Sequence, residues 1–246
     1  MKRKLRQRYE KTLDELTLMS NKFAMEVFKH KECAEHLLRT LLKDEIIRLR
    51  RVEVEKTLTN MWGKGVRLDV MGVGTTGDVY EAEIQNNLSE ASVNRASYNG
   101  ALMAMHTIKK GIKFKKKKRY RRFHVMFITD VDAGADIHYF NTQIQDDSPI
   151  GKIMHDFHTA SVDDMQDEVL KKYVGYYKRT PEGRKHMCKI MDKIHRDGER
   201  AGFRKGEKRK SKMIAISLYE SGMPIQEIMK HTRESEQQIR KWVMHA

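Results

Sequence analysis

Two stretches of alternating apolar and polar residues, joined by a glycine-rich turn, constrain the fold of this chain more than any other feature. Val66-Arg-Leu-Asp-Val-Met alternates, Gly72-Val-Gly-Thr-Thr-Gly-Asp marks a turn, and Val79-Tyr-Glu-Ala-Glu-Ile-Gln alternates again. A period of two indicates a strand that is buried on one face, and a glycine-rich turn between two such stretches is typical of a β-hairpin. The chain is therefore expected to contain a sheet that buries one face against other elements.

The hairpin carries three acidic residues whose positions are informative. Alternation places Asp69 on one face of the first strand, and Glu81 and Glu83 on one face of the second. A register in which the apolar faces coincide brings Asp69 beside Glu81 or Glu83, with side chains roughly 5 Å apart. Facing carboxylates repel each other unless a divalent cation lies between them, and a few oxygen ligands suit Mg²⁺ or Mn²⁺. The alternative is a solvated sheet face on which the acids pair with lysines.

Helical periodicity is predicted on both sides of the hairpin. Apolar residues recur at three- and four-residue steps over residues 1–50 and again over 88–110. Phe123-His-Val-Met-Phe-Ile-Thr favours a buried strand, and Ile137-His-Tyr-Phe favours a short one. This order of elements predicts an α/β domain over residues 1–150.

The remainder of the chain is predicted to be helical. Helices are expected over 167–177 and 181–200, the second with proline at its start. Glycines then recur at every fourth position among arginines and lysines: Gly198, Gly202 and Gly206. Each glycine weakens a helix by roughly 1 kcal/mol, so we interpret 151–210 as a helical, basic and partly flexible connector. Residues 211–246 form a small helical unit, whose last helix opens with the capping box Ser235-Glu-Gln-Gln.

The charge balance points to a polyanionic partner. Lys and Arg number 49 against 34 Asp and Glu, for a net charge of +15. Such a surplus favours nucleic acid, with an anionic membrane surface as the second candidate and solubility alone as the third explanation. A run of basic residues extends from Lys109 to Arg122, and it is expected to contact phosphates, or else to be a solvated loop. Its densest part consists of Lys115, Lys116, Lys117, Lys118, Arg119, Arg121 and Arg122.

Several classes of protein are set aside. Cys33 and Cys188 are too few and too far apart for a disulfide framework, and they are typical of reduced thiols in a cytoplasmic protein. Apolar runs stay well short of the ~20 residues that span a bilayer. We therefore expect a cytoplasmic protein without a membrane partner.

Beyond these patterns, several motifs resemble a known family. Arg67-Leu-Asp-Val followed by Glu81-Ala-Glu-Ile-Gln is similar to the PD-(D/E)XK nuclease superfamily, and more narrowly to its family of transposases, the recombination-promoting nucleases. Further segments extend the resemblance over most of the chain: Phe23 to Leu42, Arg95-Ala-Ser-Tyr98, Phe123 to Asp132, and Pro181 to Cys188. The resemblance implies a restriction-endonuclease-like core, a mixed sheet flanked by helices, with an α-helical C-terminal region.

The resemblance also implies roles for individual residues. Asp69 and Glu83 would ligate Mg²⁺ or Mn²⁺, and Gln85 would take the place of the lysine that orients the attacking water. The superfamily often adds a glutamate from the first core helix, where Glu32 is the best match and Glu35 the alternative. Arg95 would neutralise a phosphate, because its forked donors match phosphate oxygens.

The implied function is a metal-dependent DNA endonuclease that acts in recombination or transposition in a bacterial cytoplasm. An alternative is a non-catalytic nucleic-acid-binding protein with a degenerate site, since the amide of Gln85 cannot stabilise developing negative charge as an ammonium does. A third hypothesis is that the chain is a helical interaction protein whose basic charge serves a partner protein. The C-terminal helices resemble a helix-turn-helix, although a helical hairpin that only caps the protein is as consistent, and a homodimer is left open.

Overall fold

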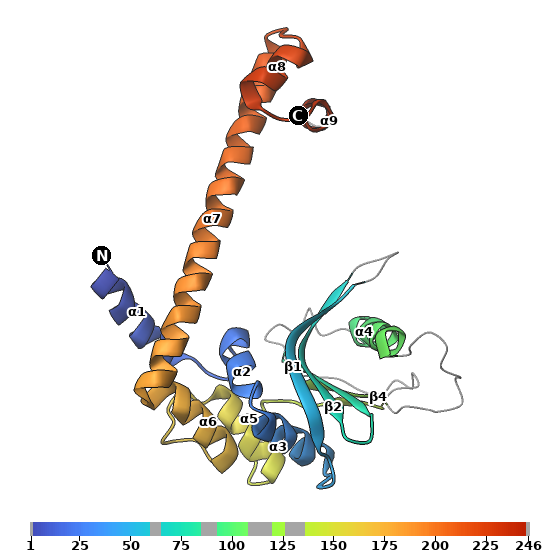
Figure 1. Cartoon of the computed structure of the whole chain (residues 1–246), viewed down its shortest axis with the longest axis vertical. Coiled ribbons are helices and arrows are strands. Elements are labelled where there is room, and N and C mark those ends of the chain that lie inside the picture. Colours follow the sequence, from blue (N-terminus) through green and yellow to red (C-terminus); the bar gives the residue numbers. More distant parts are fainter. Residues whose placement is uncertain (1, 60–64, 85–92, 108–119, 126–135, 245–246) are drawn as a thin grey trace. The chain divides into compact units, whose positions relative to one another are not determined.

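The computed structural model describes residues 2–59, 65–84, 93–107, 120–125 and 136–244 (Figure 1). Only the backbone is described at 2, 3, 93, 96, 104, 107, 120–125, 136, 137 and 139. The chain divides into two compact units, Met1–Cys188 and Lys189–Ala246. In the described part of the chain, no helix is both long and apolar enough to cross a membrane.

The first unit is built on a mixed sheet, so the predicted α/β class is confirmed. Strands β1 (Leu49–Leu58), β2 (Val66–Gly74) and β3 (Val79–Ile84) are antiparallel neighbours. Strand β4 (Tyr120–Val125) lies parallel to β3, and β5 (Asp136–Tyr139) lies parallel to β4. The predicted hairpin is β2–β3, and Gly77 in its turn has a φ of 91°, a conformation that favours glycine.

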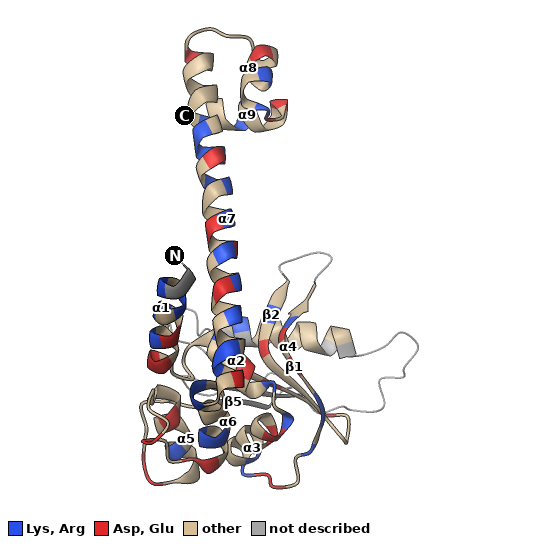
Figure 2. Cartoon of the chain, turned by 60° about the vertical axis from the view of Figure 1, so that its left-hand side comes forward, with Lys and Arg blue, Asp and Glu red and all other residues tan. Residues whose placement is uncertain are grey.

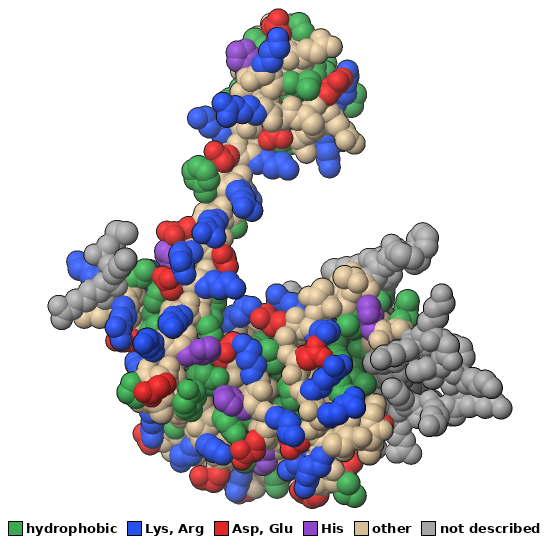
Figure 3. Space-filling view, viewed as in Figure 1, with side chains coloured by type: hydrophobic (Ala, Val, Ile, Leu, Met, Phe, Trp, Pro, Cys, Tyr) green, Lys and Arg blue, Asp and Glu red, His purple; other side chains and the backbone are tan. Residues whose placement is uncertain are grey.

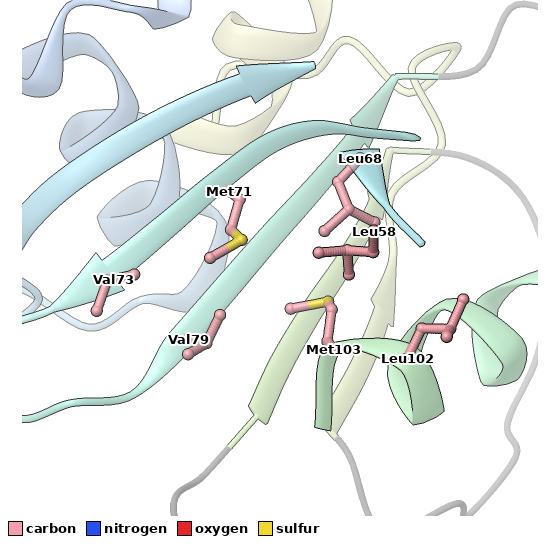
Figure 4. Packing of buried hydrophobic residues seen from close by; sticks show 7 residues of the cluster. All are labelled: Leu58, Leu68, Met71, Val73, Val79, Leu102 and Met103. Atoms are coloured by element: carbon pink, nitrogen blue, oxygen red, sulfur yellow. The ribbon is translucent and has the colours of Figure 1, made fainter. Parts of the chain in front are cut away.

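Helices cover both faces of this sheet. Helices α2 (Asn21–Phe28) and α3 (Lys31–Leu42) pack on one face, where Ala34 and Leu38 meet Leu49 and Tyr80. Helix α4 (Val93–Thr107) covers the other face (Figure 1). The cluster beneath α4 is drawn in Figure 4 and consists of Leu58, Leu68, Met71, Val73, Val79, Leu102 and Met103.

Strand β1 corrects the expectation of helix up to residue 50. The backbone N–H of Leu49 donates to Oε1 of Glu35 at 2.6 Å, which fixes the start of the strand beneath α3. Val52 then packs into the cluster on the α3 face. Leu49 ends the apolar stripe of the predicted helix, but in the folded chain it belongs to the sheet.

The helical layer extends the first unit well past residue 150. Helices α5 (Pro149–His158) and α6 (Glu168–Arg179) pack on α3 and α2. Buried Lys178 of α6 ties this layer to the end of α1 (Lys2–Glu15), because its Nζ donates to three carbonyls: Asp14 at 3.0 Å, Leu16 at 2.5 Å and Ala160 at 2.5 Å. The observed boundary at 188 therefore coincides with neither predicted boundary, 150 or 210.

The second unit contains most of α7 (Pro181–Glu220), which starts at the predicted proline. The helix runs through all three spaced glycines, so the connector is helical. The end of α7 packs with α8 (Ile225–Thr232) and α9 (Glu236–Val243) around Ala215, Ile228, Ile239 and Trp242. Ser235 caps α9 by accepting from the N–H of Gln238 at 3.3 Å, as the capping box predicts.

Candidate active site

A cleft of about 760 Å³ opens where the β2–β3 pairing ends and α4 passes over it. Its polar lining contains two carboxylates, two arginines, three asparagines and a tyrosine. The lining residues are Asn21, Gly65, Val66, Arg67, Asp69, Glu83, Asn94, Arg95, Tyr98 and Asn99. The cleft therefore combines acidic and basic groups in one space.

Asp69 lies at the end of the paired part of the hairpin. The register aligns Val70 with Ala82, and beyond this pair the N–H of Ile84 donates to Oδ2 of Asp69 at 2.9 Å. Its second oxygen, Oδ1, has no hydrogen-bond donor among the described residues. Burial raises the pKa of the Asp69 carboxyl above its ordinary value, although the Ile84 N–H and Arg95 act in the opposite direction.

Glu83 follows Ala82, so continuing the antiparallel register places it opposite Asp69. This agrees with one of the two pairings expected from the sequence, and both acids line the cleft. The Glu83 side chain is 1% exposed, and its Oε1 accepts from Nη2 of half-exposed Arg95 at 2.6 Å. The distance is that of a strong charge-assisted hydrogen bond.

Glu81 lies opposite Met71 and is also buried, with Nδ2 of Asn99 3.5 Å from its Oε1. All three hairpin acids are therefore withdrawn from solvent. The alternative of a solvated acidic face is therefore wrong.

Helix α4 supplies most of the remaining polar groups. Arg95, Tyr98 and Asn99 are spaced at i, i+3 and i+4, so they share one helical face, and that face borders the cleft. The motif Arg95-Ala-Ser-Tyr98 marked two of these residues, whereas Asn99 lies outside the motif but follows from the same helical spacing. Asn21 comes from the distant helix α2, and no pattern in the sequence marked it.

Neither candidate for the helical acid reaches the cleft. Glu32 is exposed and accepts from Nζ of Lys172 at 2.9 Å and from the hydroxyl of Tyr173 at 2.5 Å, both on α6. These two hydrogen bonds lower the pKa of Glu32. Glu35 holds the N–H of Leu49 and pairs with Arg39 at 2.8 Å, so its carboxylate fixes the start of β1. The expectation that Glu32 or Glu35 contributes an acid to the site is therefore wrong, because neither lines the cleft.

Several predicted site residues have side chains that the structure does not describe. Gln85 and the basic residues Lys115–Arg119 fall in segments that are not described. Arg121 and Arg122 lie on β4, where they align with Tyr80 and Glu81, but their side chains are not described. Their expected roles remain predictions.

The donor set of the cleft fits a hard divalent cation. Mg²⁺ is usually held by one or two carboxylates together with waters and phosphate oxygens, and Asp69 and Glu83 are two carboxylates at one cleft. Within the ranges that the structure covers, no group of three or more His, Cys, Asp or Glu is arranged to hold a metal. The two acids would therefore need water or substrate oxygens to complete a coordination shell.

No family model, curated protein or solved structure matches this chain.

Proposed function

We propose that this chain is a metal-dependent DNA endonuclease of the PD-(D/E)XK type, which hydrolyses phosphodiester bonds in recombination or transposition-like processes. The observation that carries the proposal is the pair of buried carboxylates, Asp69 and Glu83, which line one cleft with Arg95 and Tyr98. A mixed sheet flanked by helices, which the resemblance implies, supports the same assignment.

Asp69 and Glu83 would hold the cation, which when bound lowers the pKa of a water and neutralises charge at the phosphorus. The hydrogen bond from Ile84 fixes one oxygen of Asp69 and leaves Oδ1 for a ligand. The carboxylate is thus oriented by the backbone of the neighbouring strand. Such orientation reduces the reorganisation that ligand binding requires.

Arg95 would contact the substrate. Its guanidinium donates to Glu83 through Nη2 and also borders the cleft, so a phosphate at the cation would compete for the same donors. Tyr98 and Asn99, on the same helical face, add neutral donors for phosphate or sugar oxygens.

One observation favours the second candidate, a nucleic-acid-binding protein without cleavage. Arg95 already pairs with Oε1 of Glu83, so the charge of this buried acid has a partner without a metal. A cleft of this kind can persist as a phosphate-binding surface after catalysis is lost. Whether the chain cuts DNA is the measurement that separates the two functions.

The test is nicking and linearisation of supercoiled plasmid by the purified full chain with Mg²⁺ or Mn²⁺. Asp69→Asn and Glu83→Gln should abolish cleavage, since each removes one anionic ligand at constant shape. Asp69→Asn retains an oxygen that accepts from Ile84, so its thermal unfolding should stay close to that of wild type. Glu53→Gln is the matched control, because Glu53 pairs with Lys56 on β1 and does not line the cleft.

Equal cleavage by wild type and both cleft variants would refute the site. If wild type binds DNA but never cuts it, Gln85→Lys provides the next measurement, because lysine restores the cation of the superfamily motif. Metal-dependent cutting by Gln85→Lys alone would show that the site is assembled but lacks that group. Failure of both proteins to cut would support the non-catalytic alternative.

A further inference from the structure

The solvent-exposed part of α7 carries charge in two distinct arrangements. Every residue from 193 to 210 is exposed. Basic and acidic positions follow one another along the ribbon of this helix in Figure 2, and their side chains project from it in Figure 3. In its first half both arginines have acidic partners: Arg196 pairs with Asp192 at 3.1 Å, and Arg200 with Asp197 at 4.0 Å. This half is therefore close to neutral.

The second half carries five cations on one face, which we call the basic stripe: Arg204, Lys205, Lys208, Arg209 and Lys212. Their spacing of i, i+1, i+4, i+5 and i+8 places them on a common face over a rise of about 12 Å. None of the five forms a salt bridge with any residue that the structure describes. Cations on successive turns repel one another, so the stripe is an uncompensated positive surface.

We propose that the basic stripe binds the phosphate backbone of duplex DNA. This inference rests on the proposed function, because it names a second contact with the same substrate, away from the cleft. Five cations on one helical face match the regular phosphates of a duplex, and the major groove, about 12 Å wide, admits an α-helix. Bound phosphates would also relieve the repulsion within the stripe.

The composition of this segment argues against a lipid surface. A helix that binds in the membrane interface needs a large apolar face opposite its cations. No large apolar residue lies between 204 and 212, and the two that flank this range, Phe203 and Met213, are 68% and 64% exposed. The segment can bind a polyanion through charge, but it has little apolar surface to insert into lipid.

The experiment measures binding of the full chain to a short fluorescent DNA duplex by anisotropy, in EDTA and over a series of KCl concentrations. The test variant is Lys205→Gln/Lys208→Gln/Arg209→Gln. The matched control is Lys193→Gln/Arg196→Gln/Arg200→Gln, which removes the same charge from the first half of the same exposed helix. Circular dichroism of both variants establishes that helix content is retained.

The test variant should lose roughly two to three units of the log–log salt slope and bind at least about tenfold more weakly, while the control stays near wild type. Equal losses in the two variants would overturn the proposal, because net charge alone would then explain binding. Unchanged binding of the test variant would also overturn it. So would tighter binding of wild type to vesicles rich in phosphatidylserine than to the duplex.

The outcome is separable from that of the nuclease proposal. Binding in EDTA involves no cleavage, so the stripe can be established even if plasmid is never cut. Conversely, a chain that cuts plasmid through Asp69 while the test variant binds like wild type would refute the stripe alone.

Discussion

Arg95 and a divalent cation should compete for Glu83, and this competition can be measured. The Arg95 guanidinium lies 2.6 Å from a carboxylate that is 1% exposed. A charge-assisted hydrogen bond of this kind contributes about 1.5–3 kcal/mol, and each 1.4 kcal/mol is a factor of ten in an equilibrium constant. Arg95→Gln should therefore tighten Mn²⁺ binding by roughly 10- to 100-fold.

The same substitution should weaken the metal-free protein. It removes the Arg95 guanidinium from buried Glu83, and a buried pair that loses one partner is destabilised by about 3–5 kcal/mol. It should also reduce cleavage, because the phosphate loses its forked donor. Tighter metal binding together with slower cutting is a combination that simple damage to the site would not produce.

The assay is titration of Mn²⁺ into the metal-free protein, with free Mn²⁺ followed by electron paramagnetic resonance. Asp69→Asn defines binding at the cleft. Arg67→Gln is the matched control, because Arg67 lines the same cleft but is 60% exposed and pairs with Glu55 at 3.6 Å. If Arg95→Gln binds Mn²⁺ no more tightly than wild type or Arg67→Gln, the competition argument is wrong.

Two further predictions concern groups whose pKa burial perturbs. Because burial raises the pKa of Asp69, the folded state keeps a proton that the unfolded chain has already lost. Metal-free wild type should therefore lose stability relative to Asp69→Asn as the pH rises through the pKa of Asp69 in the folded state. Mn²⁺ binding should fail as the pH drops through the same pKa. Chemical denaturation and Mn²⁺ titration at a series of pH values check this, and parallel profiles for the two proteins would contradict it. Burial also lowers the pKa of Lys178 to about 8, yet Lys178→Met should reduce the free energy of unfolding by about 3–5 kcal/mol, because three carbonyls lose a charged donor. Lys171→Met is the control on the same helix, and equal midpoints in urea would refute the role of Lys178.

The hairpin could be predicted because its information is local. Alternation over Val66–Met71 and Val79–Gln85, with a glycine turn between them, fixed both the strands and the face of the acids. The helical face of Arg95 and Tyr98 follows from spacing in the same way. The β2–β3 hairpin and the polar face of α4 are therefore the parts of the cleft that sequence patterns predict.

Features that depend on distant partners could not be predicted. Strand β1 forms because β2 pairs with it and Glu35 holds its first N–H, and neither condition is visible in the strand's own sequence. Glu32 and Glu35 are one turn apart with similar surroundings in sequence, so only the packing of α6 and β1 separates their roles. Helix α7 persists through its glycines, although propensity alone favours a break.

The cleft residues are also close together along the chain, and this has a consequence for the order of folding. Nine of the ten lie between residues 65 and 99, whereas Lys178 bridges to Asp14 across 164 positions. Contacts between nearby residues close small loops and form quickly, while distant contacts pay more chain entropy. We therefore expect the β2–β3–α4 segment to assemble its acids early. An isolated hairpin is only marginally stable, so this segment depends on the helical layer that docks on it later. The stability of that docking should therefore set how often the β2–β3–α4 segment unfolds locally and the cleft is lost.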